Sequence, residues 1–318
     1  MEVIISKKKK KKKNIFLYLD ILLVIILIIG LTYIIMNHNN RNSSNNENNN
    51  STNNTENKEN NTVEVDPIEK EKKEKLKKLN NINEKIDFFK MDYLDRYISY
   101  KESHPDLDDE TIVVYVNIGL DNSFYTNVKD SPNKYTNTVL CNKYYYLGND
   151  YVPNDLVEIS SAYSSGGKKM TKEAAKAFED MSKAAKQEGY NVRAVSTYRS
   201  YDYQTNLYNN YASKDGKEKA DTYSARAGYS EHQTGLAVDV DNVKTSYTKF
   251  GNTKEFIWMK ENAYKYGFIL RYTKETEFIT GYMNEPWHYR YVGLEIAKYI
   301  QDHPMTYEEY FVRFLEGK

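Results

Sequence analysis

The sequence has very little cysteine and no excess of charge of either sign, and both shortages exclude classes of protein. Cys141 is the single cysteine among 318 residues, so the chain can form neither an internal disulfide nor a thiolate metal cluster. Lysine plus arginine number 45, as do aspartate plus glutamate, and the formal net charge is therefore zero. Nucleic-acid binding depends on a basic surface that contacts phosphates, so we expect no nucleic-acid partner.

Histidine is also scarce, and the five histidines fall into two groups. His38 lies in an asparagine-rich tract, and His104 and His303 each precede a proline in a polar turn. We expect these three to be solvent-exposed loop residues. His232 and His288 instead lie among residues that can bind a metal or transfer a proton, and they are the candidates for chemistry.

The N-terminal region has the pattern of a membrane anchor. Residues 1–14 are lysine-rich, and residues 15–36 are apolar apart from Asp20. A helix needs about 20 residues to cross a bilayer, and flanking lysines favour the cytoplasmic side. We therefore predict a single-pass protein of the cell membrane, with all later residues outside the cytoplasm. A cleaved signal peptide is the alternative, although its apolar stretch usually has only about 7–15 residues.

Two segments of unusual composition follow. Residues 37–66 are mainly Asn, Ser, Thr and Glu, which cannot bury a core, so they are predicted to form a disordered tether. Residues 67–109 are strongly charged but carry apolar residues at helical spacing: Leu76, Leu79, Ile82, Ile86 and Phe89. We predict a helical segment there, which acts as a stalk, as a partner helix or simply as a solvated helix with one packed face.

Residues 110–318 alternate short strand-like and helix-like segments, which is typical of an α+β domain. Strands are predicted at Thr111–Gly119, Asn137–Leu147, Val192–Ser196, Leu236–Val240, Gly267–Tyr272 and Trp287–Val292. Helices are predicted at Thr171–Gly189, Tyr201–Tyr211, Lys217–Arg226, Lys254–Tyr266 and Leu294–Gln301.

Both candidate histidines belong to segments that could form a metal site. Residues 230–239 read SEHQTGLAVD, and residues 285–289 read EPWHY. A catalytic zinc usually has three protein ligands and one open position for water. His232, Asp239 and His288 would supply two nitrogens and one oxygen, with Gly235 allowing a turn between the first two. Taken singly, each histidine is better explained as a hydrogen-bonded structural side chain.

Glu285 precedes the second histidine by three residues. On a turn, that spacing places a carboxylate beside the open position rather than on the metal. We therefore interpret Glu285 as the base that takes a proton from the attacking water and passes it to the leaving amine.

These motifs together resemble the VanY family of D-alanyl-D-alanine carboxypeptidases, which belongs to the LAS group of zinc peptidases. The resemblance combines residues 230–239 and 285–289 with a third block, residues 196–201 (STYRSY) followed by Gln204. It extends from about residue 117 to about residue 314. It implies a small, mainly antiparallel sheet flanked by helices, with bound Zn²⁺ and with the ligands and base named above.

The resemblance also implies substrate contacts. Arg199, Gln204 and Ser230 would hold the carbonyls and terminal carboxylate of the substrate, and Arg199 could also stabilise the transition state. Tyr272 resembles a substrate-contacting tyrosine of the group. Trp287 either walls the pocket or belongs to the core.

The implied reaction is removal of the C-terminal D-alanine from peptidoglycan stem peptides. The motifs leave open an L,D-carboxypeptidase or an endopeptidase that cuts stem peptides. A wall-binding module without activity and a scaffolding role for the charged helical segment are the alternatives outside enzymology. The presence of the base and of all three ligands argues against a silent module.

Overall fold

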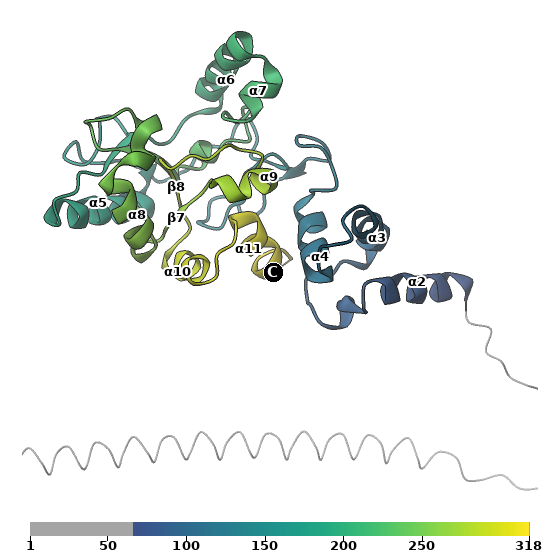
Figure 1. Cartoon of the computed structure of the whole chain (residues 1–318). Helices are drawn as coiled ribbons and strands as arrows, with labels where there is room; N and C mark the ends of the chain where they lie inside the picture. Colours follow the sequence, from purple (N-terminus) through teal and green to yellow (C-terminus); the bar gives the residue numbers. More distant parts are fainter. Residues whose placement is uncertain (1–65, 318) are drawn as a thin grey trace, which may run out of the picture. The chain divides into compact units, whose positions relative to one another are not determined.

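The structure of the protein, a computed structural model, describes residues 66–317 (Figure 1). The predicted membrane anchor and all but the last residue of the predicted tether lie outside this range. Between residues 66 and 317, no helix is long and apolar enough to span a bilayer.

The described chain is a mixture of helices, short 3-10 turns and short strands. The helices are α2 (Pro67–Lys78), α3 (Leu94–Ser103), α4 (Asp109–Ile118), α5 (Lys172–Gln187), α6 (Tyr201–Asp215), α7 (Lys217–Asp221), α8 (Lys254–Asn262), α9 (Glu277–Thr280), α10 (Leu294–Asp302) and α11 (Tyr307–Phe314). The strands are β1 (Lys129–Asp130), β2 (Tyr145–Tyr146), β3 (Leu156–Glu158), β4 (Lys169–Thr171), β5 (Arg193–Ser196), β6 (Ala237–Asp241), β7 (Phe268–Leu270) and β8 (His288–Tyr291).

The largest sheet has four strands in the order β5-β6-β8-β7, and each neighbouring pair is antiparallel. A second pair, β3 with β4, is also antiparallel, whereas β1 and β2 pair in parallel. The prediction of a mixed fold with small, mainly antiparallel sheets is confirmed. Four of the predicted strands, from Val192–Ser196 to Trp287–Val292, correspond to the four strands of this sheet.

Helix α5 covers the main core because its apolar residues share one face. Ala174, Phe178, Met181 and Ala185 recur at spacings of three and four residues, and all are fully buried. The chain leaves the helix through Gly189, whose φ of 85° lies in the left-handed region that favours glycine. The predicted helix from Thr171 to Gly189 is confirmed in place and extent.

The prediction of a strand at Thr111–Gly119 is wrong, because this segment is helix α4. The Asp108 side chain caps the helix by accepting a hydrogen bond from the Thr111 amide, and Gly119 ends it with a φ of 113°. Its β-branched residues are buried on two sides. Val113 packs toward α3 and Val114 toward α11, each within a separate apolar cluster. Apolar residues all around a helix are typical of a helix buried on every side.

Two other predictions were too long. The predicted strand at Asn137–Leu147 is mostly irregular, with only β2 as regular structure. There, the Asn142 side chain accepts hydrogen bonds from the Tyr144 and Tyr145 amides and thereby holds a tight turn. The predicted helix at Lys217–Arg226 ends at Asp221, which pairs with Arg226 through a bidentate contact.

The charged segment 67–109 is helical, but it is not one helix. Helix α2 stops at Lys78, two short 3-10 turns follow, and α3 then packs against α4. The predicted apolar residues of this segment belong to the apolar cluster that α3 and α4 form, in which Leu79 is fully buried. Residue 110, the predicted start of the enzymatic domain, lies in the first turn of α4. The division of the chain into domains stays a prediction.

Candidate metal centre

Two paired strands and one turn position the three predicted metal ligands. Asp239 on β6 and His288 on β8 are directly opposite in the antiparallel register, so their side chains leave the same face of the sheet. His232 lies in the 3-10 turn Glu231–Thr234, just before β6. Gly235 follows with a φ of 69°, and a Cβ there would lie 2.9 Å from Leu156 Cδ2. The predicted turn at Gly235 is therefore confirmed.

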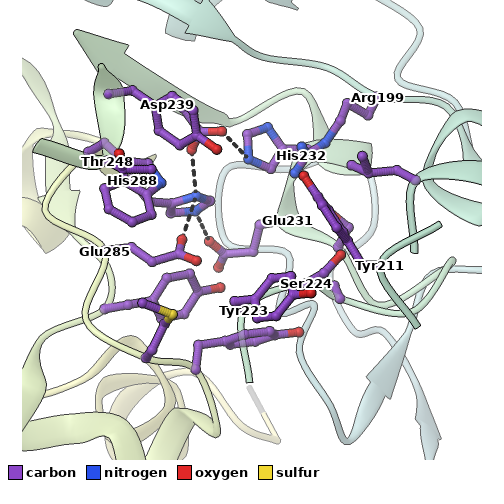
Figure 2. Close-up of a pocket in the computed structure, with 18 residues that line it drawn as sticks. Arg199, Tyr211, Tyr223, Ser224, Glu231, His232, Asp239, Thr248, Glu285 and His288 are labelled. Atoms are coloured by element: carbon purple, nitrogen blue, oxygen red, sulfur yellow. Dashed lines mark hydrogen bonds and ion pairs between the residues drawn. The ribbon is translucent and has the colours of Figure 1, made fainter. Parts of the chain in front are cut away.

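The three side chains converge on one point (Figure 2). One potential ligand atom from each of His232, Asp239 and His288 lies within 4.8 Å of the others. His232 Nε2 is 3.3 Å from Asp239 Oδ2, and His288 Nδ1 is 3.0 Å from Asp239 Oδ1. All three side chains are buried. The structure thus gathers residues that are up to 56 positions apart in the sequence.

Hydrogen bonds on the far side of each imidazole determine which nitrogen faces the centre. His232 Nδ1 is 2.7 Å from the Thr197 carbonyl oxygen, which can only accept a hydrogen bond, so Nδ1 carries the hydrogen and Nε2 is left as the ligand nitrogen. His288 Nε2 is 3.2 Å from Glu231 Oε2, which leaves Nδ1 toward Asp239. The two histidines therefore present opposite ring nitrogens to the same point.

This donor set fits a zinc ion. Two imidazole nitrogens and a carboxylate oxygen are typical zinc ligands, and tetrahedral bonds of about 2.0–2.1 Å keep ligand atoms roughly 3.3 Å apart. The separation of His232 Nε2 and Asp239 Oδ2 agrees with that value. A cation would also offset the negative charges of Asp239 and Glu285 in one buried pocket.

Glu285 lies on the turn that leads into β8. Its carbonyl accepts the His288 amide, and its own amide donates to the Tyr272 carbonyl. Its Oε2 is 3.8 Å from His288 Nδ1, beside the centre but not among the three gathered ligands. The predicted geometry of a Glu-x-x-His turn is thus present.

The buried surroundings shift the pKa values of Glu285 and His288. Burial raises the pKa of Glu285 to about 8, and the nearby charge of Asp239 acts in the same direction. Burial lowers the pKa of His288, but its hydrogen bonds to Asp239 and Glu231 outweigh burial and raise it to about 9. A carboxyl group with a pKa near neutrality in a pocket has the acidity expected of a proton-transfer group.

Most of the predicted substrate residues line one cavity of about 290 Å³ with the metal centre. Arg199, Ser230, Tyr272 and Trp287 all lie on its wall. The Arg199 Nε atom is buried and has no hydrogen-bond partner within residues 66–317. Arg199 also lines the cavity, so its guanidinium can bind a carboxylate group there.

Gln204 is the exception among the predicted substrate residues. It is 1% exposed and does not line the cavity. Its Nε2 donates to the Ala225 carbonyl at 2.7 Å, and Ala225 does line the cavity. The structure therefore places Gln204 behind the wall, and its contact with substrate stays a prediction.

Several other residues of the site carry no distinguishing mark in the sequence. Tyr211 and Tyr223 line the cavity (Figure 2), and so does Tyr247. Tyrosine is so frequent in this chain that its presence in a segment does not mark a site. Glu231 lies within the segment of residues 230–239, and the motif implies no role for it, although it contacts His288. Its place between two predicted site residues was the available signal.

Comparisons with known proteins agree with the motifs. The family model described as "VanY: D-alanyl-D-alanine carboxypeptidase" matches residues 167–294. The chain is similar to YodJ of Bacillus subtilis (strain 168), a carboxypeptidase by name, with 48% identity over 54% of this chain and 66% of that protein. It is also similar to the bifunctional D-Ala-D-Ala dipeptidase and carboxypeptidase VanXYC of Enterococcus gallinarum, with 33% identity over 54% of this chain and 91% of that protein.

Among solved structures, the LdcB LD-carboxypeptidase is similar, with a TM-score of 0.55 and 44% identity over 60% of this chain and 94% of that chain. Coverage of the longer curated relatives is less complete. The matched region spans between 52% and 66% of the length of three of them.

Proposed function

Because the chain belongs to the VanY family of D-alanyl-D-alanine carboxypeptidases, we propose that it is a zinc-dependent peptidase that removes the C-terminal D-alanine from peptidoglycan stem peptides. One observation carries the proposal: the gathering of two imidazoles and a carboxylate beside Glu285, in the cavity that Arg199 lines. This arrangement combines a cation site, a proton-transfer group and a donor for a terminal carboxylate.

In this proposal, His232 Nε2, Asp239 and His288 Nδ1 hold the zinc ion. When bound, the ion supplies Lewis-acid chemistry to the reacting carbonyl and the attacking water. Glu285 accepts a proton from that water on a carboxylate oxygen and delivers it to the departing amine nitrogen. The charge of a cation beside Glu285 favours its ionised form and so lowers its pKa from the raised value.

Arg199 binds the terminal carboxylate of the peptide in this proposal. Its guanidinium stays charged and presents a planar fork of donors, which matches a carboxylate. Ser230 and Tyr272 offer hydroxyls on the same wall, and the half-buried Trp287 shields the reacting bond from solvent.

The test uses a synthetic stem pentapeptide that ends in D-Ala-D-Ala, with released alanine measured by mass spectrometry. We expect Glu285→Gln to keep about one zinc per chain and to lose activity by at least about 100-fold, the usual size of a general-base contribution. His232→Ala should lose the metal as well. His303→Ala changes an exposed histidine and should behave like the wild type. Equal rates for Glu285→Gln and wild type would remove Glu285 from the mechanism.

An L,D-carboxypeptidase is the second candidate, and the similarity to the LdcB LD-carboxypeptidase favours it. A stem tetrapeptide, which ends with one D-alanine after an L-centre, separates the two activities. Release of alanine from the pentapeptide alone supports the D,D activity. Release from the tetrapeptide alone would replace it with the L,D activity, and an internal cut would indicate an endopeptidase.

We further propose that residues 15–36 anchor the protein in the cytoplasmic membrane and that residues 37–66 tether the enzyme outside it. The lysine-rich residues 1–14 and the length of the apolar run support this topology. Protease treatment of intact cells should digest the enzyme and leave the N-terminal segment protected. Recovery in the culture medium of a chain that lacks the N-terminal segment would instead favour a cleaved signal peptide.

A further inference from the structure

We infer that Glu231 is the positioning residue of the metal centre, which fixes the ring of His288 so that its Nδ1 atom is directed at the cation. This inference rests on the proposed zinc site and adds a residue to it. No contact between Glu231 and substrate is required, because the carboxylate acts through His288.

The contacts of Glu231 account for both of its oxygens. Oε2 lies 3.2 Å from His288 Nε2, on the side of the ring opposite the ligand nitrogen. Oε1 accepts from Arg271 Nε at 2.8 Å and from Arg290 Nη1 at 3.1 Å. Figure 2 shows His288 between Asp239 and the two glutamates, Glu231 and Glu285.

The two arginines are themselves fixed by buried partners. Both terminal nitrogens of Arg271 donate hydrogen bonds to the Glu308 carboxylate on α11, at 2.9 and 2.6 Å. Arg290 donates to the carbonyls of Val139 and Tyr291 at 2.7 and 3.0 Å. Neither arginine is more than 2% exposed. Two carboxylates therefore balance two guanidinium groups, and the position of Glu231 is determined from two directions.

Such a carboxylate has a defined effect on a metal-binding imidazole. It accepts a hydrogen bond from Nε2–H, which selects the tautomer with a lone pair on Nδ1 and makes that lone pair a stronger donor. His232 has only the neutral carbonyl of Thr197 in the equivalent place. The Glu231 carboxylate, by contrast, is also contacted by two guanidinium groups, those of Arg271 and Arg290.

The competing explanation is that Glu231 only stabilises the core through its ion pairs. Glu308 provides the matched control, because it carries the same charge in the same network but contacts Arg271 and not His288. A purely structural network would respond alike to Glu231→Gln and to Glu308→Gln.

The experiment measures the zinc dissociation constant of the full-length protein by competition with a chromophoric chelator, with folding checked by circular dichroism. We expect Glu231→Gln to weaken zinc binding by about 10- to 100-fold. Glu308→Gln should remain within about threefold of the wild type, whatever stability it loses. A folded Glu231→Gln protein with wild-type affinity would overturn the inference, as would an equal loss of affinity in both variants.

A measurement on the wild type covers the case in which Glu231→Gln does not fold. Nitrogen-15 NMR of the zinc-loaded protein should show His288 with a proton on Nε2 and metal on Nδ1, and His232 with the opposite arrangement. Metal on His288 Nε2 would overturn the inference while leaving the proposed function intact. A wild-type protein that binds no zinc would instead overturn the proposed function and the inference together.

Discussion

Lys143 is a lysine buried among aromatic rings, and its protonation should be visible in the stability of the protein. It is only 2% exposed, and its Nζ donates to the carbonyls of Asp221 and Gly281 at 2.7 and 2.6 Å. The Tyr282 ring centroid lies 4.3 Å from the same nitrogen. Burial nevertheless outweighs these contacts and lowers the Lys143 pKa to about 8.

The sign of the effect follows from proton binding in the two states. Between about pH 8 and the ordinary lysine pKa of about 10.4, the unfolded chain holds the proton that the folded chain has released. The unfolding free energy therefore rises with pH in this window, by at most about 1.4 kcal/mol per pH unit for one group. From about pH 7.5 to about pH 9.5, we expect a gain of roughly 2 kcal/mol from Lys143.

Urea unfolding at several pH values, compared between wild type and Lys143→Met, isolates this contribution. The unfolding free energy of the wild type minus that of Lys143→Met should increase by roughly 2 kcal/mol between about pH 7.5 and about pH 9.5. Loss of two hydrogen bonds changes the unfolding free energy of the variant by a similar amount at every pH. The test is therefore the dependence of this difference on pH, not its absolute value. Lys183→Met, at an exposed position on α5, should show no such slope relative to wild type. A Lys143→Met difference that stays constant with pH would refute the argument.

Three further predictions concern the reactivity of Cys141, the tolerance of Gly228 to a side chain, and the removal of zinc. Cys141 is fully buried and its pKa is raised by burial, so a thiol reagent should modify the native protein at least about 100-fold more slowly than the unfolded protein. Gly228→Ala should lower the unfolding free energy by about 3 kcal/mol or more, because its Cβ would lie 1.9 Å from the Tyr146 ring. Gly166→Ala is the control: its φ is similar, but a Cβ there would have no atom within 4 Å, so a thermal melt should show a clearly smaller loss of stability. Removing zinc with a chelator should lower the melting temperature, by an amount equivalent to about 4 kcal/mol if the metal was present at 1,000 times its dissociation constant.

The candidate metal centre was accessible from sequence because its parts are marked locally. His232 and Asp239 are joined by a short segment with one glycine, and Glu285 is three residues from His288. The geometry within each of these two pairs depends on a turn or on a single strand, and local sequence determines turns and strands. The pairing of β6 with β8, which brings the two segments together, is not marked by a local pattern.

The ion network behind the centre was not accessible in this way. Glu231 is separated from Arg271 by 40 positions and from Arg290 by 59. No local pattern relates them, and buried charges are the exception in protein cores. The error at α4 has a different cause. Its run of valine and isoleucine favours a strand in isolation, but the Asp108 cap and burial on two faces favour a helix.

The register of β6 against β8 connects the fold to the chemistry. Side chains alternate between the two faces of a sheet, so a shift of one residue would move Asp239 to the face opposite His288. The neighbouring pairs in this register are Val238 with Tyr289 and Ala237 with Arg290. Val238 and Tyr289 are both fully buried in the main core, so the correct register is the one that buries them. The same alternation then places Arg290, two residues beyond His288, on the face of the sheet where it contacts Glu231. Burial of an apolar pair thus selects the register that assembles both the ligands and their support.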